Sequence, residues 1–160
     1  MSANDANLGL SGQVHALLKD QYGFIKYENV GPNVVTVIGR EYTVRGLTST
    51  SAIAFKWVGI GTNAGGEATT DTSLGSECVS LGGSRTSCIP TITTVTSNND
   101  TAQFIVTFTF TGNLNVSESG VFNNSTFPSG NILCRKTFAV IPCQNGDQLT
   151  ITWKVTASSS

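Results

Sequence analysis

The chain has 160 residues, the usual size of a single domain and enough to enclose a hydrophobic core. Charged residues make up only 12% of it, about half the roughly 25% of typical soluble domains, and the net charge is −1. Without a basic excess the chain has no electrostatic field to attract nucleic acid or an anionic membrane, so we expect neither partner.

The N-terminal sequence MSANDANLGLSG lacks the basic start and the apolar stretch of a signal peptide, and no apolar run approaches the ~20 residues of a membrane span. We therefore expect synthesis in the cytoplasm. Any route out of the cell would be assembly and release.

The first predicted elements are two strands and a helix. GQVHALLKD and QYGFIKYENVGPN are typical of strands, with a break at Gln21–Gly23 and a stop at Gly31-Pro32. The following segment, NVVTVIGREYTVRGLTS, does not alternate cleanly between apolar and polar residues. It predicts a short helix at residues 38–47.

The later elements alternate more clearly. IAFKWVGI places every second residue on one face, and TITTVTS with AQFIVTFTFTG predicts a hairpin that turns around Ser97–Thr101. A turn at Asn145–Asp147 leads into the final strand, LTITWKV. The side chains expected to be buried are Phe55, Trp57, Phe104, Val106, Phe108, Phe122, Leu149, Ile151 and Trp153.

Short strands separated by turn signals predict an all-β protein, a single antiparallel β-sandwich of the jelly-roll or Ig-like kind with at most one short helix near residues 38–47. We expect one domain over residues 1–160. Its N-terminus, residues 1–10, and its C-terminal tail, residues 157–160, are expected to be flexible.

Four cysteines leave two interpretations open. Cys78 and Cys88 flank LGGSRTS, which is flexible enough to close a disulfide loop, so this pair is the candidate disulfide. Cys134 and Cys143 end the segment CRKTFAVIPC, and in an extended strand they would lie roughly 30 Å apart, too far for a disulfide. The alternative is that the cysteines are free buried thiols, since nothing fixes the redox compartment.

The glycine-rich segment GIGTNAGG, residues 59–66, suggests a phosphate-binding loop but fails in detail. The pattern G-x-G-x-x-G needs a glycine where Ala64 stands, G-K-[ST] is absent, and no helical pattern follows. A cation site from Glu67, Asp71 and Glu77 lacks the spacing of a calcium loop, and solvated loop acids are the simpler interpretation.

Catalysis finds little support. The only histidine, His15, alternates within a predicted strand, and no G-x-S-x-G elbow or paired carboxylates stand out. Trp57 and Trp153 could stack on sugars, but in alternating strands they are more often core residues. We therefore expect no enzyme, no cofactor and no metal.

Six phrases follow one another along the chain: GQVHALLKD, NVVTVIG, GIGTNAGGEATTDTSLGSE (Gly59–Glu77), ESGVF (Glu118–Phe122), ILCRKTF and LTITWKV (Leu149–Val155). Each phrase alone is weak, but their order resembles a diffuse group of small structural proteins of tailed bacteriophages. The resemblance spans residues from about Gly12 to Thr156. The insert SECVSLGGSRTSC and the cysteines at positions 134 and 143 depart from the pattern.

The resemblance implies a non-enzymatic virion component that is made in the bacterial host cytoplasm and located in the virion. A capsid decoration or cement protein is the first expectation and a tail or neck protein the alternative. The expected partners are neighbouring virion proteins, either the major capsid protein or tail and neck proteins, and further copies of the chain.

A rigid β-framework with neutral loops suits docking, and low charge limits repulsion between packed copies. The candidate contact loop lies within Gly59–Glu77, with the residues Gly59, Gly61, Thr62, Asn63 and Asp71. The segment NNSTFPSG, Asn123–Gly130, is a second candidate. A different class, a module that binds carbohydrate or a receptor, stays open and would need exposed aromatic residues in a groove.

Overall fold

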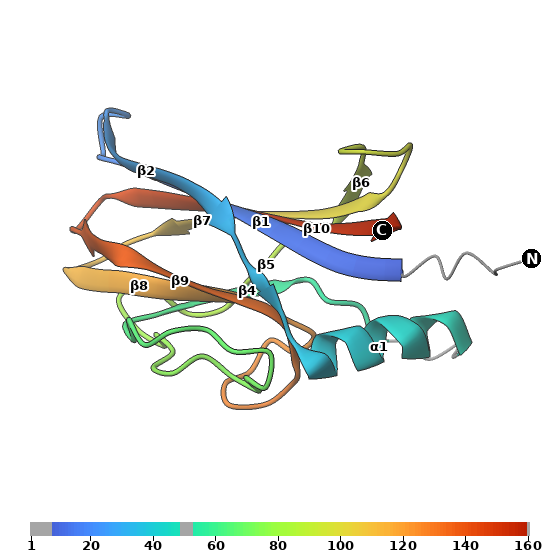
Figure 1. Cartoon of the computed structure of the whole chain (residues 1–160). Coiled ribbons are helices and arrows are strands. Elements are labelled where there is room, and N and C mark those ends of the chain that lie inside the picture. The colour runs from blue at the N-terminus through green and yellow to red at the C-terminus, as the bar shows by residue number, and fades with distance from the viewer. Residues whose placement is uncertain (1–7, 49–52, 160) are drawn as a thin grey trace, which may run out of the picture.

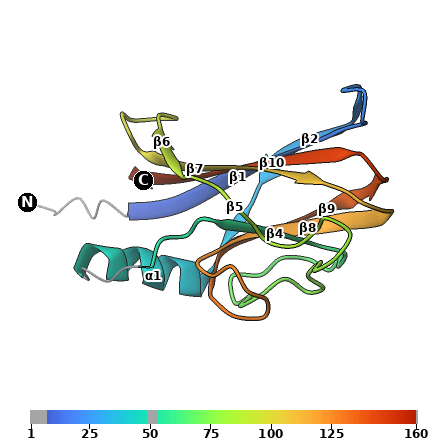
Figure 2. The same ribbon diagram turned by 180° about the vertical axis from the view of Figure 1, so that it is seen from behind.

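The computed structural model describes residues 8–48 and 53–159. Two five-stranded antiparallel sheets pack face to face, as Figures 1 and 2 show from opposite sides. Sheet A has the strand order β2-β1-β10-β7-β6, and sheet B has the order β3-β9-β8-β4-β5. The predicted all-β sandwich with one short helix is confirmed.

The elements follow one another with the helix after the third strand. Their bounds are β1 Leu8–Lys19, β2 Ile25–Pro32, β3 Val34–Val35, α1 Val37–Thr48, β4 Trp57–Gly61, β5 Thr86–Ser87, β6 Thr91–Thr93, β7 Thr101–Thr109, β8 Leu114–Phe122, β9 Ile132–Cys143 and β10 Gln148–Ser159.

The core lies between the sheets, and its sheet A side follows the alternation of β7 and β10. In these antiparallel strands Trp153 stands opposite Phe104, Ile151 opposite Val106, and Leu149 opposite Phe108. All six side chains are buried, because every second residue of a strand points to the same face. The predicted inward faces of these two strands are confirmed.

Helix α1 begins where the sequence predicts it. The hydroxyl of Thr36 accepts a hydrogen bond from the backbone N–H of Gly39, so Thr36 caps the first turn. Gly39 is the buried residue of the helix, and a β-carbon there would lie 2.2 Å from the carbonyl oxygen of Leu133 in β9. A residue without a side chain lets the helix approach the sheet at this point.

The predicted inward face of β4 is wrong. Val58 and Ile60 are buried in the main core, whereas Phe55 and Trp57 are only partly buried. Trp57 packs with Phe122 in a separate cluster outside sheet B. Loops cover this outer face, so both faces of β4 are buried and the alternation carried no information on which faces the core.

Part of each predicted flexible terminus belongs to a strand, while residues 1–7 and 160 lie outside the described residues. Residues 8–10 belong to β1 and residues 157–159 to β10, where Leu8 pairs with Ser159 and Leu10 with Ala157. This pairing joins the two ends of the described chain. It could not be detected from either end alone, because Ser and Gly at an end look like a tail.

The candidate disulfide between Cys78 and Cys88 is not formed; the structure has the alternative, four free thiols, of which Cys88 is only partly buried. Cys78 donates its backbone N–H to Ile60, whereas Cys88 donates to Lys56. These two acceptors are four residues apart along one extended segment, about 13 Å at 3.3 Å per residue, whereas bridged Cα atoms lie within about 7 Å. Cys134 and Cys143 lie at opposite parts of β9, the predicted extended segment.

Candidate contact surface

The predicted contact loop leaves β4 and runs over the outer face of sheet B. Gly59 and Gly61 lie within β4 and are buried, so they cannot touch a neighbouring molecule. A β-carbon on Gly61 would lie 2.4 Å from a carboxylate oxygen of Glu118. The accessible part of the loop begins at Thr62, which is exposed, while Asn63 and Asp71 are partly buried.

A buried carboxylate, Glu118 of β8, holds this loop from beneath. It accepts backbone N–H groups from Asn63 at 3.3 Å, Gly75 at 2.9 Å and Ser76 at 2.7 Å. Arg135 of β9 completes the set with its Nε at 3.1 Å and its Nη2 at 2.8 Å. The N–H groups of the glycine-rich loop thus cradle an anion, and that anion is the protein's own Glu118.

Arg135 also binds the same loop directly. Its guanidinium donates to Asp71 at 2.8 Å and to the carbonyl oxygens of Gly65 and Gly66, both at 3.3 Å. Together with the two bonds to Glu118, these contacts use all five N–H donors of an arginine. Arg135 therefore has no donor left for an external ligand.

A separate ion pair fixes the middle of the loop. Glu67 contacts Lys136 Nζ at 2.8 Å and accepts the Thr137 backbone N–H at 3.1 Å and the Thr137 hydroxyl. Burial alone would raise the pKa of Glu67, but the hydrogen bonds from Lys136 and Thr137 outweigh it and lower the pKa to about 2. The carboxylate is therefore held in its charged form.

The second predicted loop, residues 123–130, is joined to the first by Arg85. This side chain forms a bidentate salt bridge with Glu77, from Nε to Oε1 at 2.6 Å and from Nη2 to Oε2 at 2.9 Å. Both side chains are almost fully buried. Its Nη1 donates to the carbonyl oxygens of Asn124 and Ser129. The guanidinium also lies over the Phe122 ring, 3.7 Å from its centroid.

Both candidate loops therefore form one continuous layer outside sheet B, which we call the loop face: residues 62–77 and 123–130. Figure 1 shows these segments in green and orange on the side of sheet B away from sheet A. The residues of the second loop from Asn124 to Gly130 are exposed, as are Thr69, Thr70, Thr72 and Ser73 in the first.

The cation site considered from the sequence is not assembled. Glu67, Asp71 and Glu77 each pair with a different base, namely Lys136, Arg135 and Arg85. Among the described residues, no three of His, Cys, Asp and Glu come together as metal ligands. The acids of this loop serve as anchors.

The other chemical candidates lie away from the loop face. His15 bonds Glu28 at 2.9 Å on the outer face of sheet A, and Trp153 is fully buried. No helix in residues 8–48 and 53–159 is long and apolar enough to cross a membrane.

Sequence reasoning missed the anchors Glu118, Arg135 and Arg85. A signal was present: in a chain with 12% charged residues, Glu118 and Arg135 interrupt the apolar strands β8 and β9. A charged residue at a strand position that is expected to be buried predicts an oppositely charged partner, because a buried charge is stable only when it is paired. Which residue is the partner depends on the register of β8 with β9, where Gly120 stands opposite Arg135.

No protein-family model, no curated protein and no solved structure matches the chain. The function therefore has to be argued from the geometry of the loop face and from the order of the sequence phrases.

Proposed function

We propose that this protein is a non-enzymatic structural component of a tailed-phage virion, and within that class a capsid decoration or cement protein. The loop face is the surface that docks onto neighbouring virion proteins. The order of the six sequence phrases supports the assignment to virion structural proteins. The structure of the loop face supports a role in docking onto neighbouring proteins.

One observation carries the proposal: the charges behind the loop face are neutralised internally, and its exposed residues are neutral. Arg135 and Glu118 have no free hydrogen-bonding capacity. Between positions 69 and 73 the exposed residues are all Thr or Ser, and the partly buried Asp71 is paired with Arg135. Such a surface can be desolvated in an interface without stranding an ion.

The second supporting feature is that the phrases meet in space. Asp71 comes from the T-D-T phrase, Glu118 from ESGVF and Arg135 from ILCRKTF, and these three residues form one network. The residues of these sequence phrases together hold the surface loop against sheet B. A preorganised loop loses little conformational entropy on docking, and many copies on a lattice multiply a weak contact.

The carbohydrate-binding alternative lacks the aromatic groove it needs at the tryptophans. Trp153 is fully buried and Trp57 packs under the loops with Phe122. The tail or neck alternative differs from decoration in copy number. Mass spectrometry of purified particles decides between them: copies on the order of hundreds indicate decoration, and roughly six or twelve indicate a ring. The absence of the protein from particles would overturn the proposal.

The loop face is tested with charge additions that spare the anchors. In Thr72→Glu/Ser73→Glu, two carboxylates would have to be desolvated on docking, so we expect incorporation into particles to fall at least about tenfold. The matched control is Gln13→Glu/Gln148→Glu, two exposed positions of sheet A. If both variants remain folded and join particles equally well, the loop face is not the docking surface.

A further inference from the structure

A pair of apolar features at opposite ends of the molecule fit one another. The first is the tip of the β1–β2 hairpin, where Tyr22 is 77% exposed, Phe24 71% and Ile25 60%. Clustered exposed aromatic side chains are unusual on a monomer and mark interaction sites. Figure 1 shows this hairpin projecting beyond the neighbouring strands.

The hairpin tip is held in one conformation. Asp20 accepts the backbone N–H groups of Tyr22 and Phe24, both at 2.9 Å, and Gly23 supplies the positive φ of 90° that the turn needs. Behind the tip, Lys26 pairs with the buried carboxylate of Asp147 at 2.6 Å. The exposed rings are thus presented on a fixed turn, which lowers the entropy cost of inserting them into a partner.

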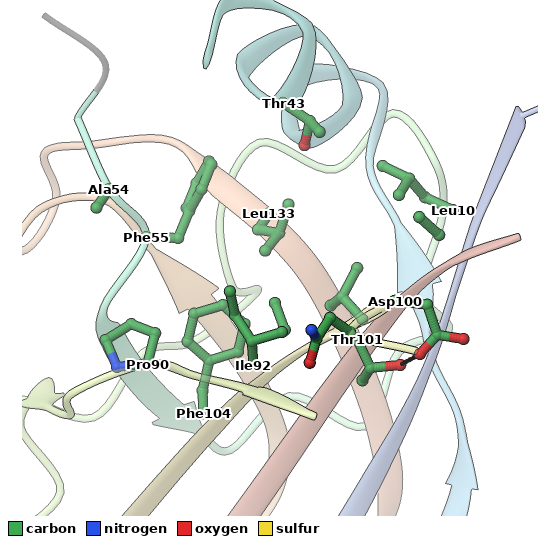
Figure 3. Close-up of a pocket in the computed structure, with 14 residues that line it drawn as sticks. Leu10, Thr43, Ala54, Phe55, Pro90, Ile92, Asp100, Thr101, Phe104 and Leu133 are labelled. Carbon is green, nitrogen blue, oxygen red and sulfur yellow. Dashed lines mark hydrogen bonds between the residues drawn. The ribbon is translucent and has the colours of Figure 1, made fainter. Parts of the chain in front are cut away.

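The second feature is an apolar pocket of about 410 Å³ beside α1, lined by strands β1, β6, β7 and β10 of sheet A and by Leu133 of sheet B (Figure 3). This volume falls within the roughly 300–1,000 Å³ of binding pockets. Apolar side chains dominate its lining, among them Leu10, Phe55, Ile92, Phe104 and Leu133. Ile92 at its rim is exposed.

Asp100, the only charged residue among the described residues that line the pocket, forms its hydrogen bonds within its own turn. Its carboxylate accepts the N–H groups of Val95, Thr96 and Ser97 and the hydroxyls of Thr96 and Thr101. These bonds lower its pKa, so the charge stays within the turn. An occupant of the pocket therefore needs to be apolar and uncharged.

Helix α1 extends this apolar surface. Gly39, Thr43 and Leu47 are four residues apart and share one helix face. Gly39 is seated on β9 and Thr43 lines the pocket, but Leu47 is 82% exposed. The face that packs on the sandwich at one end of the helix is thus left uncovered by described residues at the other.

The length of strand β1 gives the distance between the hairpin tip and the pocket. Leu10 lines the pocket and Asp20 begins the hairpin turn, ten residues further, or about 33 Å along the strand. The tip of one molecule cannot reach its own pocket across that distance. It can reach the pocket of another copy.

We propose that copies of this chain associate head to tail, with the β1–β2 hairpin tip of one copy seated in the apolar pocket beside α1 of the next. The contact joins two different surfaces, so each added copy leaves a tip and a pocket free, and the assembly grows or closes into a ring. The association uses only these two features and holds whether or not the protein belongs to a virion.

The test uses variants that disable one feature at a time. Tyr22→Ser/Phe24→Ser removes the tip, and Ala157→Trp fills the pocket from its exposed rim. Ile105→Ser is the matched control, because it removes a half-exposed apolar side chain from the outer face of sheet A. Circular dichroism and thermal unfolding identify the variants that are folded, and Ala54→Glu replaces Ala157→Trp if the latter is not.

Sedimentation velocity of the wild-type protein between about 10 μM and about 1 mM, the range of weak contacts, should show mass rising beyond a dimer. Each disabled variant should associate at least about tenfold more weakly, while Ile105→Ser should match the wild type. An equimolar mixture of the tip and pocket variants should form a one-to-one dimer and stop there. A wild-type monomer throughout, unaffected association in the variants, or no dimer in the mixture would each overturn the proposal.

Discussion

Glu118 is a buried carboxylate whose hydrogen-bond donors all come from the protein itself. Three loop N–H groups and two guanidinium N–H groups surround it. A buried ion pair of this kind contributes little net stability compared with apolar residues, but removing one partner leaves an uncompensated charge. Its value here is that it fixes where the loop lies.

Replacing Arg135 by Met should therefore lower the free energy of unfolding by roughly 3–5 kcal/mol, since it removes one partner of a buried ion pair. Urea unfolding measures this change. Lys154→Met is the control, because Lys154 forms no ion pair with a described residue, and it should change the free energy by less than about 0.5 kcal/mol. A loss under about 1 kcal/mol in Arg135→Met would mean that the network does not hold the loop.

At the scale of elements, the sequence predicts best where one strand face is core and the other is solvent. Strands β7 and β10 meet that condition, and their buried residues follow from alternation. Strand β4 does not, because the loop face covers its outer side. The choice between a Cys78–Cys88 disulfide and free thiols, and the strand pairing of residues 8–10 with 157–159, depend on partners distant in the chain, which local patterns do not contain.

The contact between α1 and β9 offers an element-scale prediction with an internal control. Gly39→Ala places a β-carbon 2.2 Å from the Leu133 carbonyl oxygen, so helix and strand must separate, and we expect a loss of about 1–3 kcal/mol. Gly46 lies in the same helix, and apart from the adjoining helix backbone no described atom lies within 4 Å of an added β-carbon there. Gly46→Ala should raise stability by about 0.5–1 kcal/mol, because alanine favours helix.

Denaturant unfolding of both variants checks these opposite signs. If Gly39→Ala were as stable as Gly46→Ala, the close approach of α1 to β9 would be incorrect. The pocket beside α1 would then have a different shape, since Thr43 reaches it only from a helix seated on Leu133.

At the scale of the whole molecule, the two proposed contacts use different directions. The β1–β2 hairpin tip and helix α1 lie at opposite ends of the sandwich along the strands, and the loop face lies on the outside of sheet B (Figures 1 and 2). The pocket lies at the α1 end. In the two proposals, one molecule binds further copies at its ends and a different partner across its face. The two sets of contacts do not compete, so self-association and docking can be disabled independently.

The last prediction concerns the acid stability of the molecule. Glu67 has a pKa of about 2 in the fold, against an ordinary value of 4.5. Between these values the unfolded chain binds a proton that the folded chain does not. This stabilisation is therefore complete above about pH 4.5 and is lost as the pH falls toward 2, with an upper limit of about 3 kcal/mol. The lowered pKa of Asp100 acts with the same sign.

We expect urea midpoints to be level from pH 7 to about 4.5 and to fall below it, and Glu67→Gln should reduce that fall while lowering stability at pH 7. Glu41→Gln is the matched control, because Glu41 is an exposed helix residue paired only with Arg45 among the described side chains. Its acid profile should parallel the wild type. If the acid profile of Glu67→Gln also runs parallel to that of the wild type, the ion pair of Glu67 with Lys136 does not contribute to the pH dependence of stability.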